Sequence, residues 1–131
     1  MIAHEGFESP MLNFALVALG GALGAMSRYA LATVILPGSR FPWATLAINI
    51  AGSFLIGLIW GHSAQQQWFQ EWGRLFLVVG VLGGFTTFSA FSLETLSLID
   101  NHRFVDAFGY VLLSVSGCVV ATWFGNRFAG W

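Results

Sequence analysis

The chain has 131 residues, of which 56% are hydrophobic and 8% are charged, and its formal net charge is −1. A soluble domain carries about 25% charged residues, and a chain this small cannot hide so much apolar surface from water. The composition therefore excludes a water-soluble domain. Without a basic stretch there is no sign of nucleic-acid binding, and the single Cys118 excludes an intrachain disulfide and a thiol-rich metal cluster.

Four apolar stretches follow one another along the chain, each close to the ~20 residues that a helix needs to cross a bilayer. We predict an all-α membrane protein with helices at about 11–36, 43–64, 72–99 and 103–127. Residues 1–10 lack the basic region of a signal peptide, and we expect them to form a mobile tail. The remaining residues, 11–131, are predicted to be one four-helix membrane domain.

The arginines do not indicate a single membrane orientation. Four spans place both termini on one side together with Arg74 and Arg127, whereas Arg40 and Arg103 lie on the other side. Because the charges are balanced, the positive-inside rule favours neither orientation. We hypothesise that the chain inserts in both orientations and forms an antiparallel homodimer. The alternative is one fixed orientation with a weak charge bias.

Glycines occur in every predicted span. Three pairs have the small-xxx-small spacing that lets helix backbones approach closely, Gly20–Gly24, Gly57–Gly61 and Gly80–Gly84. No internal repeat is visible, so a single chain needs a partner to build a symmetric pathway. We interpret the glycine pairs as support for dimerisation.

Polar residues at membrane depth are candidate functional groups, because lipid offers them no hydrogen bonds. Arg28 in the first span either extends toward the helix end or supplies a cation that attracts anions to a vestibule. Asn49 in the second span either donates to an anion or bonds another helix, and Glu94 lies near the end of the third span. A stripe with a spacing of four follows the last helix: Tyr110, Ser114, Cys118 and Thr122.

The stretch GGFTTFSAFS, residues 83–92, interrupts the third span. Gly83 and Gly84 disfavour a helix, and the β-branched Thr86 and Thr87 add to this effect. We therefore predict a break near the middle of the span. Backbone carbonyls that a break releases suit a cation such as sodium, as in the discontinuous helices of transporters.

Aromatic residues recur every three positions through the same stretch, at Phe85, Phe88 and Phe91. The edge of a phenyl ring is electropositive, so it can contact an anion without donating a hydrogen bond. The alternative interpretation is ordinary phenylalanine that packs in a core or faces lipid.

Three blocks of the sequence resemble the signature of one family. GGALGAMSRY in the first span, TLAINIAGSFLIG in the second and GVLGGFTTFSAFSLET in the third resemble, in the same order, the motifs of the Fluc-type (CrcB family) fluoride ion channels. The resemblance implies an antiparallel dual-topology homodimer with two fluoride-selective pores and a structural sodium ion (Na+) at its centre. It implies passive export of toxic fluoride across the bacterial cytoplasmic membrane, without an organic cofactor.

The resemblance also implies roles for individual residues. Phe88 and Phe91 would line the pore with their ring edges, Arg28 would belong to the vestibule, and the carbonyls of Gly83 and Thr86 would hold the sodium ion. The other implied pathway residues are Asn49, Thr87, Ser89, Glu94, Tyr110, Ser114 and Thr122. Cys118 departs from the family, whose members carry serine on this track, and a thiol is a weak donor.

Two other classes of protein remain open at this point. A small four-helix proton-coupled multidrug exporter relies on a carboxylate in the first helix, but that helix carries Arg28 here and the only membrane candidate is Glu94. A non-transporting membrane assembly protein would use the glycine faces to bind partner helices. No cluster of nucleophile, metal ligands or acid and base groups predicts an enzyme.

Overall fold

The structure is a computed structural model that describes residues 9–130, so the predicted tail lies outside the described residues except for Ser9 and Pro10. Four apolar helical segments are long enough to cross a membrane, which confirms the predicted all-α architecture with four spans. The helices are α1 (Pro10–Val34), α2 (Trp43–Ser63), η1 (Phe69–Leu82), α3 (Gly83–Phe85), α4 (Phe88–Asp100) and α5 (Phe104–Ala129).

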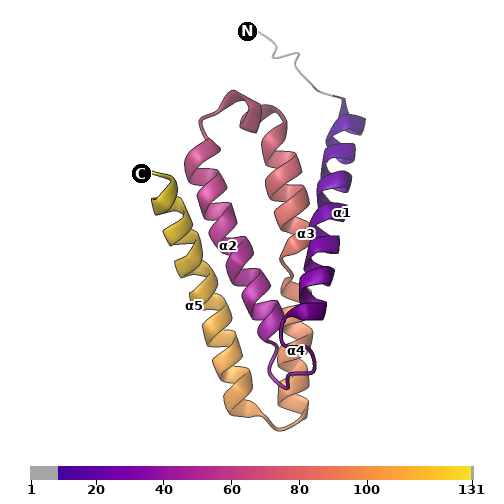
Figure 1. Ribbon diagram of the computed structural model, residues 1–131, viewed down its shortest axis with the longest axis vertical. Helices are drawn as coiled ribbons and strands as arrows, with labels where there is room; N and C mark the ends of the chain where they lie inside the picture. The colour runs from indigo at the N-terminus through magenta and orange to yellow at the C-terminus, as the bar shows by residue number, and fades with distance from the viewer. Residues whose placement is uncertain (1–8, 131) are drawn as a thin grey trace.

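The four spans form two pairs of neighbouring helices (Figure 1). Helix α1 packs against η1 and α3, and α2 packs against α5; within each pair the helices run in the same direction along the long axis, and the two pairs run in opposite directions. Both described ends of the chain lie at the same end of the molecule as the α2–η1 connection. At the opposite end, Arg103 Nη1 donates a hydrogen bond to the Arg40 carbonyl and so joins the two loops there.

Glycines make both close helix contacts possible. A Cβ atom on Gly24 would collide with the Val81 carbonyl of η1, and a Cβ on Gly80 would lie 2.9 Å from the Gly20 Cα. In the second pair, a Cβ on Gly57 would collide with the Thr122 carbonyl of α5. These contacts all lie within one chain. The glycine pairs therefore explain how the chain packs on itself, and they no longer support dimerisation independently.

The contact at Gly24 can be tested against its neighbour Gly21, beside which a Cβ would meet nothing within 4 Å. We expect Gly24→Ala to destabilise the protein by about 1–3 kcal/mol, because the new methyl group meets backbone that cannot rotate away. Gly21→Ala should be neutral or stabilising by up to about 1 kcal/mol, because alanine favours a helix. Thermal unfolding in detergent measures both variants, and equal midpoints would contradict this account of the α1–η1 contact.

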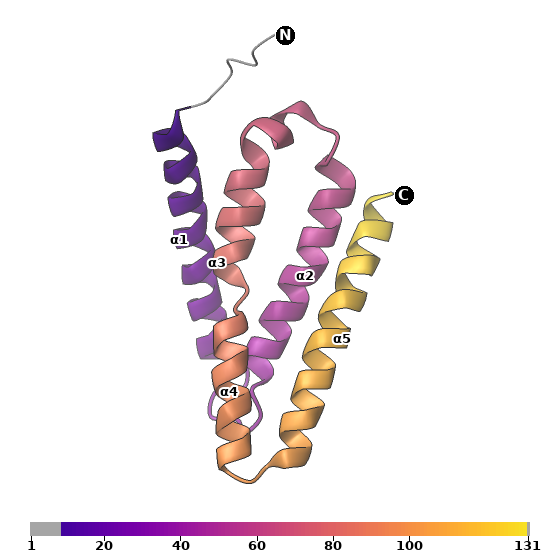
Figure 2. The same ribbon diagram turned by 180° about the vertical axis from the view of Figure 1, so that it is seen from behind.

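The third span does not run as a uniform α-helix. Its first part, η1, is a π-helix, whereas the sequence predicts ordinary α-helix from residue 72; no sequence pattern distinguishes the two kinds of hydrogen bonding. Thr86 (φ −84°, ψ 155°) and Thr87 (φ −148°, ψ 112°) are extended between α3 and α4. Figure 2 shows this non-helical connection from behind. The Thr87 hydroxyl then accepts a hydrogen bond from the Ala90 N–H and caps α4.

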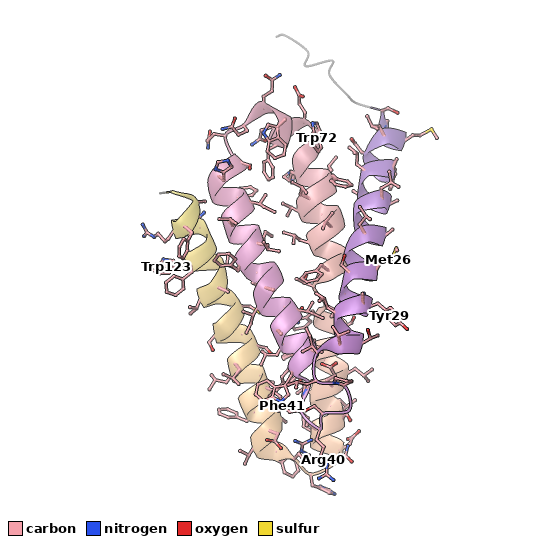
Figure 3. The ribbon with its side chains drawn as sticks, viewed as in Figure 1. Met26, Tyr29, Arg40, Phe41, Trp72 and Trp123 are labelled. Atoms are coloured by element: carbon pink, nitrogen blue, oxygen red, sulfur yellow. The ribbon has the colours of Figure 1, made fainter. Side chains whose placement is uncertain are left out.

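The outer surface of the helices carries large apolar side chains. Met26 and Tyr29 point away from α1, and 66% and 73% of their respective surfaces are exposed (Figure 3). Trp72 and Trp123 are also exposed, and both lie toward the end that holds the termini. Indole rings prefer the boundary between lipid and water, and apolar side chains prefer the hydrocarbon. This surface therefore suits a bilayer.

Candidate functional site

A cavity of about 420 Å³ lies where α2, the third span and α5 meet. Thr86 and Thr87, the two extended residues after α3, belong to its lining. The predicted site residues in its lining are Asn49, Gly83, Thr86, Thr87, Phe88, Phe91 and Ser114. The other lining residues are Gly52, Ser53, Ile56, Val78, Leu82, Val115, Cys118 and Val119.

Asn49 bridges α2 and the extended segment through both ends of its amide group. Its Nδ2 donates to the Thr87 carbonyl at 3.1 Å, and its Oδ1 accepts from the Thr87 N–H at 2.8 Å. A side-chain amide thus pairs with both backbone polar groups of this extended residue. One Nδ2 proton is left over, because the amide has two. Asn49 therefore holds the extended segment and keeps one donor for another partner.

Hydroxyl groups surround the same segment. The Thr86 hydroxyl donates to the Leu82 carbonyl at 2.9 Å, and the oxygens of the Thr87 and Ser89 hydroxyls lie 3.3 Å apart. Ser89 is exposed and lies beside the cavity lining rather than in it. The hydroxyls of Thr86 and Thr87 thus serve the fold by satisfying backbone groups.

Aromatic rings form a continuous series from the cavity to the loop before α2. The ring centres of Phe88 and Phe91 are 5.2 Å apart, and those of Phe91 and Tyr110 are 5.1 Å apart. Phe41 then meets Tyr110 edge to face at 5.5 Å. Phe91 is buried, whereas 75% of the Phe88 surface is exposed in the single chain. Phe88 thus presents its ring at an open side of the cavity.

Glu94 lies outside the cavity lining and is held by two hydroxyl groups. Thr45 donates to Glu94 Oε1 at 2.7 Å, and Tyr110 donates to Glu94 Oε2 at 2.6 Å. Tyr110 is fully buried. The hydrogen bonds among Thr45, Glu94 and Tyr110 join α2, α4 and α5. Both carboxyl oxygens are therefore occupied by hydrogen bonds within the chain.

The polar stripe on α5 divides into groups with different surroundings. Ser114 and Cys118 line the cavity, but Tyr110 and Thr122 do not. The Thr122 hydroxyl donates to the carbonyls of Ser53 and Cys118, at 3.0 Å in each case, and so ties α5 to α2. The Ser114 hydroxyl is buried and has no hydrogen-bond partner within residues 9–130.

Arg28 links the first span to α3. Its Nε donates to the Gly84 carbonyl of α3 at 3.0 Å, and the side chain is half-buried. Arg28 lies outside the lining of the cavity. The structure therefore gives this arginine a role in holding α1 against α3, next to the extended segment.

The predicted sodium ligands are the backbone carbonyls of Gly83 and Thr86. A hard cation requires oxygen ligands, and a backbone carbonyl supplies one without any charge to balance. The extended conformation of Thr86 leaves its carbonyl without a hydrogen-bond donor among the described residues. Both Thr86 and Gly83 border the cavity. The Thr86 backbone thus fits a carbonyl-bound cation, whereas residues 9–130 contain no His, Cys, Asp or Glu cluster that could bind a metal.

The sequence analysis did not predict several of the cavity residues. Those on α2 could have been found most easily. Gly52, Ser53 and Ile56 follow Asn49 at spacings of three, four and seven, which places all four on one helical face. Thr45 as a partner of Glu94, and Phe41 beside Tyr110, depend on contacts between distant segments. No pattern within either segment indicates these contacts.

The fold and the cavity define a multi-pass integral membrane protein with a partly polar, aromatic-lined cavity between its helices. The family model described as CrcB-like protein, Camphor Resistance (CrcB), matches residues 15–126. The chain belongs to this family.

Curated relatives have similar lengths and are bacterial. The chain is 45% identical to the "Fluoride-specific ion channel FluC" of Geobacter sulfurreducens, a match that covers 88% of this chain and 94% of the relative. It is 47% identical to the protein of the same name from Agrobacterium fabrum and 49% identical to that from Paramagnetospirillum magneticum, with the same coverage. Because bacterial outer-membrane proteins are β-barrels, an all-helical protein of this family belongs in the cytoplasmic membrane.

Proposed function

We propose that this protein is a fluoride-selective ion channel that lets toxic fluoride leave the cytoplasm passively. The observation that carries the proposal is the identity of 45–49% to proteins named fluoride-specific ion channels, over 88% of this chain. The cavity supports it, because its wall combines phenylalanine rings with hydroxyl and amide groups. A channel has no chemical step, so the proposal requires no catalytic residue.

The proposed pathway replaces the water of a small, strongly hydrated anion. Phe88 and Phe91 would turn electropositive ring edges toward fluoride. Their ring centroids are 5.2 Å apart, so the two rings would be neighbouring contacts on the pathway. The free Nδ2 proton of Asn49 and the unpartnered hydroxyl of Ser114 would donate hydrogen bonds. Larger chloride would be excluded mainly by width. Weak binding at several positions, rather than tight binding at one, permits conduction.

Other predicted residues have supporting places in this proposal. Thr87 and Ser89 would keep the extended segment polar, and Thr122 would hold α5 in register with α2. Glu94 and Tyr110 would form a partly buried polar group at the end of the aromatic series. Arg28 would add positive charge near the break while it bonds the Gly84 carbonyl.

We further propose that the working unit is an antiparallel homodimer with two pores. Phe88 is 75% exposed in one chain although it borders the cavity, so a second chain is needed to enclose the pathway on that side. The balanced arginines at the two ends of the molecule support insertion in both orientations. Reporter fusions at the C-terminus test this, and a signal from only one side of the membrane would contradict it.

The carbonyls of Gly83 and Thr86 would hold a structural sodium ion where the two chains meet. When bound, the cation would supply positive charge that holds carbonyl groups of the two extended segments together. The extended Thr86 backbone supports this assignment, since its carbonyl is not used by a helix.

The geometry does not favour either of the two other classes of protein. A proton-coupled exporter needs a carboxylate that can exchange protons with its substrate site, but Glu94 is bonded to Thr45 and Tyr110 outside the cavity. An assembly protein that offers glycine faces to partners is not favoured either, because Gly24, Gly57 and Gly80 contact helices of the same chain.

Fluoride efflux from liposomes tests the proposed function. The purified protein should release trapped fluoride, as recorded with a fluoride electrode, at a rate well above that of protein-free liposomes. No proton gradient should be needed, because the transport is passive. Release that depends on an imposed proton gradient would point to the exporter class, and no release would contradict the proposal.

A further inference from the structure

Cys118 is the only cysteine of the chain, and the proposed pathway makes no use of it. It lies on α5, is half-buried and lines the cavity together with Phe88 and Ser114. A thiol that borders a cavity is a nucleophile that a small molecule can approach.

A second side chain in the cavity wall, Ser114, has no hydrogen-bond partner among the described residues. It lies one helical turn from Cys118, and only 6% of its surface is exposed. Buried hydroxyls are almost always hydrogen-bonded in folded proteins. The wall beside Cys118 is therefore suited to a small polar molecule from the cavity.

The backbone at Cys118 is held in place. Its carbonyl accepts the Thr122 hydroxyl, which also donates to the Ser53 carbonyl of α2. A Cβ on Gly125, farther along α5, would collide with the Phe54 carbonyl, so the two helices are in close contact there. A group added to the sulfur of Cys118 would consequently extend into the cavity rather than push α5 away.

We propose that Cys118 is a covalent modification site for small, uncharged thiol-reactive molecules, and that its modification closes the ion pathway. This inference rests on the proposed function, because it places the cavity in that pathway. The cavity of about 420 Å³ has room for a small adduct. Because the lining is largely apolar, a small uncharged reagent fits it better than a large charged one.

Methyl methanethiosulfonate is a suitable probe. The thiolate sulfur of Cys118 attacks the methylthio sulfur, and a new S–S bond forms. The bond between the reagent's two sulfur atoms breaks, methanesulfinate leaves with the electron pair, and the thiol proton passes to water. The cysteine sulfur is oxidised to a mixed disulfide, and the reagent is reduced by the same two electrons.

The test uses the full chain in liposomes. Treatment should add one methylthio group per chain by intact mass, reduce fluoride efflux to the rate of protein-free liposomes, and be reversed by dithiothreitol. In Cys118→Ser, the efflux rate with the reagent should equal the rate of the same variant without it. A matched control places a thiol elsewhere on α5: Val105→Cys in the Cys118→Ser background, since Val105 is 86% exposed and lies outside the cavity lining. This variant should be labelled without loss of efflux.

Several results would overturn the inference. Labelling of Cys118 with unchanged efflux would show that the thiol lies away from the pathway, and labelling only after denaturation would show that it is inaccessible. Inhibition that persists in Cys118→Ser would place the reactive group elsewhere. Failure of the proposed function looks different, because the untreated protein would then release no fluoride, while labelling of the folded protein would still test access to Cys118.

Discussion

Phe88→Ile is expected to reduce fluoride efflux to the rate of protein-free liposomes while the protein still folds. The Phe88 ring borders the cavity, but 75% of it is exposed in the single chain, so little core packing is lost when the ring is removed. Isoleucine fills similar space but has no electropositive ring edge to meet an anion. The expected loss therefore reports on the aromatic contact rather than on stability. A fluoride electrode measures the efflux, and thermal unfolding in detergent measures the fold.

Phe108 provides the matched control for this substitution. It is 70% exposed on α5 and lies outside the cavity lining. Phe108→Ile should leave fluoride efflux close to that of the unmodified protein. Phe91→Ile is a less clean test, because the Phe91 ring is buried between Phe88 and Tyr110 and its loss also disturbs packing. Efflux that persists in Phe88→Ile would remove the aromatic contact from the proposed mechanism.

Asn49→Ala is expected to destabilise the protein and to stop fluoride efflux. The substitution removes both hydrogen bonds to Thr87 and leaves the N–H of that residue unpaired beside the cavity. Each unsatisfied backbone group costs about 1–3 kcal/mol. The extended segment between α3 and α4 would lose its link to α2, so the residues around it would no longer be held in position. Thermal unfolding and fluoride efflux should both respond.

Ser53 lies one turn from Asn49 on the same face of α2 and also lines the cavity. Its carbonyl accepts the Thr122 hydroxyl, and this bond survives when the side chain is shortened. Ser53→Ala should therefore unfold at nearly the same temperature as the unmodified protein. If Asn49→Ala matched Ser53→Ala in unfolding temperature, the two hydrogen bonds of Asn49 would not hold the segment in place.

The spans were predictable because each is a long apolar run between polar or proline-containing connections. Their ends were less predictable where the connection is itself apolar. Hydropathy predicts that the first span reaches residue 36, but α1 ends at Val34, since Leu36 has a positive φ of 41°. It predicts that the third span begins at 72, but η1 begins at Phe69 and includes the polar Gln70 and Glu71. Hydropathy alone does not show that a helix continues for a polar turn beyond its apolar region.

Residues of the candidate site were predictable where their chemistry is unusual for a membrane. Asn49 and the hydroxyls near Thr87 stood out, and the structure brings them together. Their partners were not predictable, because a GxxxG spacing or a single amide does not specify which helix it meets. Glu94 was expected in the pathway, yet its surroundings are the hydroxyls of Thr45 and Tyr110 outside the cavity lining. Such pairings depend on how whole helices pack.

The selectivity of ion release tests the central claim most directly. Liposomes that contain the purified protein and trapped fluoride or trapped chloride are compared with ion-selective electrodes at equal concentrations. We predict rapid release of fluoride and no release of chloride above that of protein-free liposomes. Release of both ions at similar rates, or of neither, by correctly folded protein would contradict the proposed channel.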